Sequence, residues 1–284
     1  MAITTIKIHP AIGIARLGNS PDGFFIGPEL PGDRTPPPGG YKDAQCRIKR
    51  QAARFRLFGY DQNGVFTGEI TAADATITWT AHLANTKAEW LRFHRAGTPV
   101  NHVPPPNTDW RNWQVADRST LIIDPGSRSI AGPNQAAGFN TGQFLGVQVS
   151  LGEMRTDQDG RLLILGGFGN SSSPTNAPLT YWAENDGWHD DVSDGPVTAT
   201  VILNGMNNPI QAAGAWVICV PPKFAPVIDN IITLYDVMYQ VAVDKLGVVP
   251  SPVPSFNGDI FPILDRAIKV QWVDKTAADR KSVV

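Results

Sequence analysis

The sequence predicts a mainly β protein, antiparallel and sandwich-like, with a few helices near residues 85–96, 228–246 and 259–272, so that the overall class is α+β. Three observations support this. The 284 residues include 27 Gly and 24 Pro, which both disfavour helix interiors. Stretches of apolar and β-branched residues recur at the length of strands. Turn signals such as Asn63-Gly64, Asp124-Pro125-Gly126 and Asn204-Gly205 separate those stretches.

The first hundred residues are expected to form several strands. IKIHPAIGIARLG (6–18) is rich in β-branched residues and predicts a strand with a kink at Pro10. Residues 24–40 contain too many Pro and Gly for a ladder or a helix, so they predict a loop. AARFRLFGYDQNGVFTGEIT (52–71) is typical of a hairpin with its turn at Gln62-Asn63-Gly64, and ATITWTAHL from Ala75 predicts the next strand.

Helices are expected at three places. Leu83, Trp90, Leu91 and Phe93 have roughly helical spacing before Gly97. After the strands of 119–205 and a last strand stopped by Pro221 and Pro222, a second helix is predicted to begin at Asp229 or Asn230 and to end at Gly247. DIFPILDRAIKVQWV predicts a third, which tolerates Pro262 in its first turn. The second helix carries an apolar stripe that needs a surface to pack on: Ile231, Ile232, Tyr235, Met238, Tyr239, Ala242 and Leu246.

The organisation expected is a single domain over 1–273, with C-terminal helices from about residue 228, followed by a disordered tail over 274–284. The formal charge of -2 gives no electrostatic basis for binding nucleic acid. Without a basic, then apolar leader or a span of roughly 20 apolar residues, we expect no membrane segment. The protein is then cytoplasmic, or exported without a conventional signal peptide. Its two cysteines, Cys46 and Cys219, are expected to be reduced and buried.

The densest polar cluster is the acidic loop, ENDGWHDDVSD (184–194), which lies between two predicted strands. This cluster could bind a hard cation, perturb the pKa values of its own members, or orient a substrate amine; its residues are Asp186, His189, Asp190, Asp191 and Asp194. The competing interpretation, which we favour on the sequence alone, is a loop of Asx turns that satisfies its own backbone. The spacing of the five histidines does not predict a zinc site. GGFGNSSSP (166–174) lacks the spacing of a phosphate-binding loop, and GxSxG, GxxxxGK[ST] and paired CxxC motifs are absent.

Six strings, in order from about Ile6 to Val273, resemble the N-terminal region of the lysine 6-oxidase and glycine oxidase family of quinoprotein amine oxidases. They are IHPAIGIARLGNSPDGFFIGPE, YKDAQCRIKRQAARFRLFGYD, IIDPGSRSI, LGEMRTDQDGRLLILGG, ENDGWHDDVSDGPV and DIFPILDRAIKVQWV.

The resemblance implies oxidative deamination of an amino acid amine, giving an aldehyde or oxo acid, ammonia and hydrogen peroxide. Family members are longer, and they carry a cysteine tryptophylquinone in the C-terminal half. Trp216 and Cys219 are three apart in a predicted strand and so face opposite sides. Cys46 has no nearby Trp in sequence, although Trp79 or Trp90 could approach it in space. Because neither cysteine lies in a string that resembles the family's cross-link region, the resemblance implies no quinone and no catalytic residue in this chain. The acidic loop is the expected contribution to the wall around the quinone, with His189 as the main substrate-facing candidate beside Trp188, Asp190, Asp191 and Asp186.

Three hypotheses remain open on the sequence. The first is the N-terminal domain of such an oxidase, non-catalytic alone, which works with a C-terminal half on another chain or by self-association; VDKTAADRKSVV at the end of the sequence suggests an interrupted gene or a standalone copy. The second is a freestanding module that pairs with a full-length oxidase or another partner through an apolar surface. The third is a metal-dependent enzyme built on the loop from Asp186 to Asp191.

Overall fold

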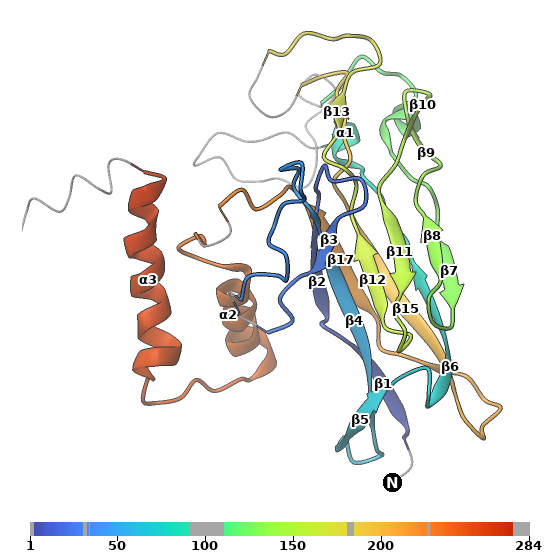
Figure 1. The fold of residues 1–284 in the computed structure, drawn as a ribbon, viewed down its shortest axis with the longest axis vertical. Coiled ribbons are helices and arrows are strands. Elements are labelled where there is room, and N and C mark those ends of the chain that lie inside the picture. The colour runs from blue at the N-terminus through green and yellow to red at the C-terminus, as the bar shows by residue number, and fades with distance from the viewer. Residues whose placement is uncertain are drawn as a thin grey trace, which may run out of the picture. The chain divides into compact units, whose positions relative to one another are not determined.

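The computed structural model describes residues 3–30, 33, 35–90, 111–180, 185–225 and 228–274. The chain divides into two compact units (Figure 1). The first, which we call the β unit, comprises residues 1–29 and 35–222, and the second, the helical unit, comprises 30–34 and 223–284. Our prediction of a single domain over 1–273 stays a prediction, and its disordered tail lies almost wholly outside the described residues.

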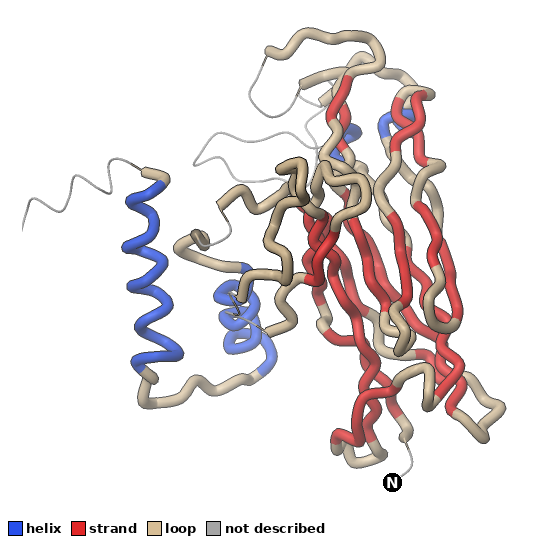
Figure 2. The backbone as a smooth tube through the Cα atoms, in the orientation of Figure 1, coloured by secondary structure: helices blue, strands red, loops and turns tan. Residues whose placement is uncertain are grey.

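The β unit is built on one sheet in the order β7-β6-β15-β17-β2-β4-β12-β11-β8, and β1, β3 and β5 also pair with β4 while β16 pairs with β15 (Figure 2). Two further pairs, β9 with β10 and β13 with β14, stand apart from it. The strands are β1 (Thr5–His9), β2 (Ile12–Arg16), β3 (Phe24–Ile26), β4 (Arg50–Tyr60), β5 (Phe66–Ile70), β6 (Ala75–Ala81), β7 (Arg128–Ala131), β8 (Ala136–Gly138), β9 (Gly142–Phe144), β10 (Val147–Val149), β11 (Glu153–Thr156), β12 (Leu162–Leu165), β13 (Ser171–Ser172), β14 (His189–Asp190), β15 (Ser193–Leu203), β16 (Ile210–Gln211) and β17 (Ala215–Val220).

The mainly β class is confirmed, and the sheet is mixed where antiparallel pairing was expected. β17 runs parallel to β2, and β3 runs parallel to β4. The sheet curls, because its two end strands β7 and β8 are in contact. One hydrophobic core lies inside the curl, with Trp79, Phe55 and Phe139 among its largest buried side chains. Burial of such aromatic side chains is worth roughly 1.5–3 kcal/mol each, so this core dominates the stability of the unit.

The hairpin predicted at Gln62-Asn63-Gly64 is confirmed, since β4 and β5 pair on either side of it. Asp61 fixes the turn: its side chain accepts hydrogen bonds from the backbone N–H groups of Asn63 (2.8 Å) and Val65 (2.9 Å). At Pro10 the expected kink is a break between two strands, β1 and β2. β1 pairs with β4, whereas β2 lies chiefly against β17, so the two short strands join distant parts of the sheet.

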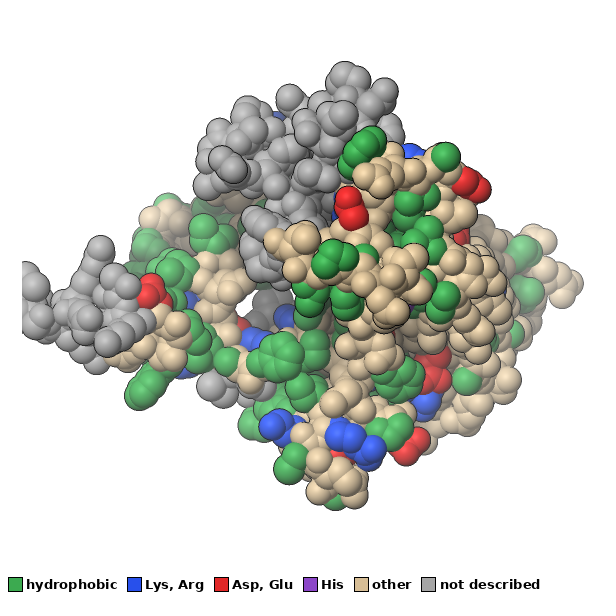
Figure 3. All heavy atoms as spheres, turned by 90° about the horizontal axis from the view of Figure 1, so that it is seen from above, with side chains coloured by type: hydrophobic (Ala, Val, Ile, Leu, Met, Phe, Trp, Pro, Cys, Tyr) green, Lys and Arg blue, Asp and Glu red, His purple; other side chains and the backbone are tan. Residues whose placement is uncertain are grey.

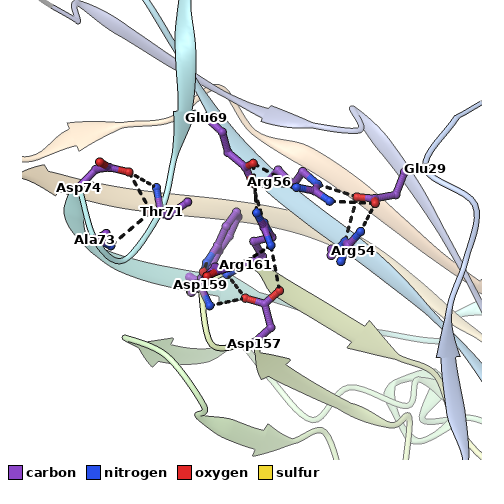
Figure 4. Close-up of polar contacts among 12 residues, drawn as sticks. Glu29, Arg54, Arg56, Glu69, Thr71, Ala73, Asp74, Asp157, Asp159 and Arg161 are labelled. Carbon is purple, nitrogen blue, oxygen red and sulfur yellow. Dashed lines mark hydrogen bonds and ion pairs between the residues drawn. The ribbon is translucent and has the colours of Figure 1, made fainter.

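A chain of ion pairs crosses the outer face of β4 and β5 (Figure 4). Glu29 bridges Arg54 and Arg56, and Glu69 bridges Arg56 and Arg161. Burial opposes ionisation of Glu29, but the hydrogen bonds and charges of Arg56 and Arg54 outweigh it and hold the pKa of Glu29 at about 2. The network links a loop, a hairpin and the β11–β12 turn, so it clamps three segments that are distant in sequence.

The helices follow the predictions with corrected boundaries. α1 (Lys87–Trp90) lies within the predicted 85–96 helix, of which residues 91–96 are outside the described residues. α2 (Leu234–Leu246) begins at Thr233, not at Asp229 or Asn230 as expected, because Thr233 and Asp236 form a capping box. It ends as predicted at Gly247, whose φ of 72° suits glycine. The third helix comprises a π turn (Phe256–Ile260), α3 (Phe261–Lys269) with Pro262 in its first turn, and a 3-10 turn (Val270–Trp272).

Candidate functional site

The acidic loop lies at one end of the β unit, where β14 pairs with β13 and α1 is close by (Figure 1). Ser171 stands opposite Asp190, and Ser172 opposite His189. The glycine-rich segment 166–173, which the sequence offers no reason to connect with the acidic loop, is therefore its direct neighbour.

Asp191 anchors the two segments to each other. Its side chain is 1% exposed, and its Oδ2 accepts hydrogen bonds from the backbone N–H groups of Phe168 (2.8 Å) and Asn170 (3.0 Å). A β-carbon at Gly167 would lie 2.5 Å from the same oxygen, so only glycine permits this approach. Burial raises the pKa of Asp191 against the effect of these N–H donors. The other carboxyl oxygen, Oδ1, is buried and has no hydrogen-bond partner among the described residues.

His189 is the second buried polar residue of the loop. It is 7% exposed, and its ring lies 5.1 Å from that of Phe144 in β9. Its Nε2 is 2.9 Å from Oγ of Ser172, while Nδ1 is buried and unpartnered within the described part of the chain. Burial lowers the pKa of His189, against the nearby charge of Asp190. The lowered pKa favours the neutral imidazole, whose Nε2 lies within hydrogen-bond distance of the Ser172 hydroxyl.

The carboxylates of Asp190 and Asp186 bind other parts of the β unit. Asp190 forms an ion pair with Lys87 and accepts a hydrogen bond of 3.1 Å from Nδ2 of Asn85. Asp186 accepts a hydrogen bond of 2.7 Å from the backbone N–H of Asn112. Both carboxylates thus fasten the loop to segments near α1, whereas a loop of Asx turns would satisfy its own backbone.

Arg111 holds the middle of the loop by hydrogen bonds to its backbone. The residue is 5% exposed, and its Nη2 donates to the carbonyl oxygens of Asn185 (3.0 Å) and Trp188 (2.8 Å). Asn112 adds an acceptor, because its Oδ1 lies 2.5 Å from the backbone N of Gly187. Residues 185–188 of the loop are therefore held in place by hydrogen bonds from Arg111 and Asn112.

Trp188 lines a hollow of about 310 Å³ beside this platform. Nε1 of Trp188 donates to the carbonyl oxygen of Ala177 at 2.9 Å, so the indole is held in place. The size is at the lower end of small-molecule pockets. Hydroxyl and amide groups on its wall can hydrogen-bond a polar ligand, and none of the residues that form it carries a charge: Ser171, Ser172, Ser173, Asn176, Ala177 and Trp188.

The hypothesis of a metal enzyme gains no support from this geometry. In the described residues no group of three or more His, Cys, Asp or Glu side chains is placed to hold a metal ion. Asp186, Asp190 and Asp191 each turn to a different protein partner instead of converging.

The two cysteines do not fit a cysteine tryptophylquinone within the described residues. Cys219 in β17 is buried, and burial raises its pKa to about 12. Trp216 on the same strand is 42% exposed and bonds Asp194 through Nε1, so it faces the opposite side, as predicted. The expectation that both thiols are buried is wrong for Cys46, which is exposed in a turn with a φ of 61°.

Several residues that build the site escape sequence reasoning: Asn85, Lys87, Arg111, Asn112 and Ser172. Each is a common polar residue far along the chain from the acidic loop. The available signal is the glycine-rich segment itself, in which Gly167 permits the close approach of Asp191.

The sequence model of the family described as "L-Lysine epsilon oxidase N-terminal" matches residues 9–219. The chain belongs to this family, and the resemblance carried by the six strings is confirmed.

The particular relatives are lysine oxidases of Marinomonas mediterranea. The L-lysine 6-oxidase of that organism is 32% identical over 316 aligned positions, which cover 94% of this chain and 43% of the relative. The crystal structure of its L-Lys ε-oxidase as a Schiff base intermediate with L-Lys superposes with a TM-score of 0.74 at 29% identity, and another structure of the ε-lysine oxidase with 0.73 at 30%. Each structural match covers 94% of this chain and 45% of the relative. The chain thus spans less than half the length of the relatives it matches.

Within the described residues, no helix is both long and apolar enough to cross a membrane.

Proposed function

We propose that residues 1–284 are the N-terminal part of an amino acid oxidase of the L-lysine 6-oxidase type, which converts the substrate amine to an aldehyde or oxo acid with release of ammonia and hydrogen peroxide. The observation that carries the proposal is the match over 94% of the chain to a lysine 6-oxidase, in sequence and in structure. We infer that residues 1–284 do not perform the oxidation alone, because in the described part of the chain Cys219 and Trp216 face opposite sides of β17 and Cys46 is exposed in a turn.

In this proposal, residues 1–284 shape the substrate site and orient the substrate. Trp188 and Ser172 present an indole and a hydroxyl at the hollow, where a polar amino acid substrate would be held against the quinone-bearing part. His189 acts on the substrate through Ser172, as a neutral imidazole that directs the hydroxyl. Asp186, Asp190 and Asp191 are positioning residues that keep the loop rigid. Rigid placement of a polar contact is what lowers the cost of binding in a productive geometry.

Two assays test the proposal. Purified 1–284 should release no hydrogen peroxide with L-lysine or glycine. A chimera in which 1–284 replaces the matching part of the Marinomonas mediterranea enzyme should release it with an amino acid substrate. In that chimera Trp188→Ala should raise KM more than it lowers kcat, whereas Phe66→Ala, an exposed aromatic residue in the β4–β5 hairpin, should change neither. Quinone absorbance and peroxide from 1–284 alone would sink the proposal.

A further inference from the structure

The helical unit exposes an unusual amount of apolar surface. Of the thirty large hydrophobic side chains that are exposed among the described residues, twenty lie in 231–273. α2 has no buried residue in its thirteen positions. Soluble proteins rarely leave contiguous apolar patches of more than a few hundred Å² uncovered, so such a surface indicates an interaction site.

Three apolar residues of α3 and one of the 3-10 turn that follows it form a stripe on one side, while Ile263 lies off this stripe. Phe261, Leu264, Ile268 and Trp272 follow the spacing i, i+3, i+7, i+11, which places them on one face. They are 51%, 49%, 61% and 76% exposed. Arg266, on the other side, is 7% exposed and forms an ion pair with Asp236 of α2. The polar side of α3 is therefore used within the unit, and the apolar side is left outward.

α2 repeats this arrangement. Asp236 lies on the side that binds Arg266, while Leu234, Met238 and Val241 lie on the opposite side and are each more than 40% exposed. Tyr235 and Tyr239 stack with ring centroids 6.1 Å apart beside them. Because Asp236 and Arg266 join the sides of α2 and α3 that lie opposite these stripes, the two stripes point away from each other. We call the stripe that begins at Phe261 of α3 the apolar helical face; hydrophobic side chains on this unit's surface are visible in Figure 3.

The extent of the match to the L-lysine 6-oxidase bears on what covers this face. The N-terminal family model ends at residue 219, just before the helical unit begins at Lys223. The match to the L-lysine 6-oxidase, however, covers 94% of the chain, which requires most of the helical unit to be included. The helices thus lie beyond the N-terminal family domain but within the long oxidase, and more than half of that oxidase is outside the match.

We propose that the apolar helical face is the docking surface for the polypeptide that makes up the remaining, quinone-bearing part of a lysine 6-oxidase. This inference rests on the proposed function and names the partner surface. An anionic membrane is disfavoured as the occupant, because such helices are rich in Lys and Arg on their polar side. Here acidic residues outnumber basic ones over 234–272: Asp236, Asp244, Asp259 and Asp265 against Lys245, Arg266 and Lys269.

The test co-expresses tagged 1–284 with the part of the Marinomonas mediterranea L-lysine 6-oxidase that lies beyond the match, and measures how much of that segment is recovered. The variant combines Phe261→Asp, Leu264→Asp and Ile268→Asp. The matched control combines Val65→Asp and Phe66→Asp, which change exposed apolar residues of the β unit. Near-UV circular dichroism verifies that the β unit of each variant is folded. We expect the triple variant to lose at least about tenfold of the recovered segment, since three central apolar anchors are removed, and the control to match the unsubstituted chain.

Three results would overturn the docking proposal: equal recovery with the triple variant, no recovery with the unsubstituted chain, or a homodimer of 1–284 that the triple variant abolishes and the segment does not displace. Free 1–284 should also bind a hydrophobic dye, and the triple variant should bind several-fold less; unchanged dye binding would mean that the face is already covered. Peroxide release separates this proposal from the function. If the triple variant abolishes the complex but the unsubstituted complex releases no peroxide, the docking proposal stands and the proposed function is wrong. If the complex releases peroxide and the triple variant forms it equally well, the proposed function stands and the docking proposal is wrong.

Discussion

The two hydrogen bonds that join Asp191 to the glycine-rich segment give the most specific prediction about the site. In Asp191→Ala, the backbone N–H groups of Phe168 and Asn170 lose their acceptor in a position that is 1% exposed. Phe168 is half-buried and Asn170 is exposed, so water can replace part of the lost acceptor. A hydrogen bond of this kind contributes about 0.5–1.5 kcal/mol, so the net loss should be roughly 1–3 kcal/mol. For a unit of this size the melting temperature should fall by roughly 2–12 °C.

Asp191→Asn is the matched comparison. Its amide oxygen can keep both N–H bonds, so the loss should be no more than about 1 kcal/mol. The sign of the pH dependence follows from the raised pKa of Asp191. A carboxyl group whose pKa is higher in the folded than in the unfolded state stabilises the fold at pH values below its unfolded-state pKa. This stabilisation is lost as the pH rises through its folded-state pKa. The unsubstituted chain should therefore gain stability relative to Asp191→Asn as the pH falls from neutral towards 4.

Urea unfolding followed by near-UV circular dichroism measures these differences, and hydrogen exchange of residues 167–170 locates them. In Asp191→Ala those amides should exchange faster while the amides of β4 and β15 keep their protection. An Ala variant as stable as the unsubstituted chain, or an Asn variant as unstable as the Ala variant, would refute the role given to the two hydrogen bonds.

Three further predictions concern other parts of the chain. Glu29→Gln should remove part of the acid sensitivity of the β unit. Because its pKa is lowered, the Glu29 carboxylate stabilises the fold above about pH 4.5, and this stabilisation is lost as the pH falls to about 2. Acid titration of both proteins should therefore show a difference in unfolding free energy that shrinks over that range. Thr233→Ala should cost the start of α2 about 1 kcal/mol, because the capping box with Asp236 is lost, and hydrogen exchange in 234–238 should rise while it stays unchanged in α3. Cys46 should react with a thiol reagent within minutes and Cys219 only after unfolding, so titration of the native protein should give one equivalent; two fast equivalents would contradict the burial of Cys219.

Local chemistry explains which parts of the fold the sequence predicts well. The turn at Gln62-Asn63-Gly64 and the helix end at Gly247 depend on residues within a few positions, and both are confirmed. The start of α2 was misplaced because Asp229 and Asn230 are as good at capping as Thr233. What decides between them is Asp236, three residues after Thr233, which completes the capping box.

The candidate site is harder to predict, because it is assembled from segments up to about a hundred residues apart. Asp190 meets Asn85 and Lys87, and Asp191 meets the 166–170 segment, and none of these pairs leaves a periodic signal in the sequence. The parallel pairing of β17 with β2 is equally non-local. Cys46 was misjudged for a related reason: residue type favours burial of a free thiol, but its turn conformation is set by neighbouring backbone contacts.

Hydrogen peroxide release with L-lysine tests the central claim most directly, measured on purified 1–284 and on 1–284 co-expressed with the remaining part of the Marinomonas mediterranea enzyme. We expect no peroxide and no quinone absorbance from 1–284 alone, and lysine-dependent peroxide from the complex. Peroxide together with quinone absorbance from 1–284 alone would contradict it.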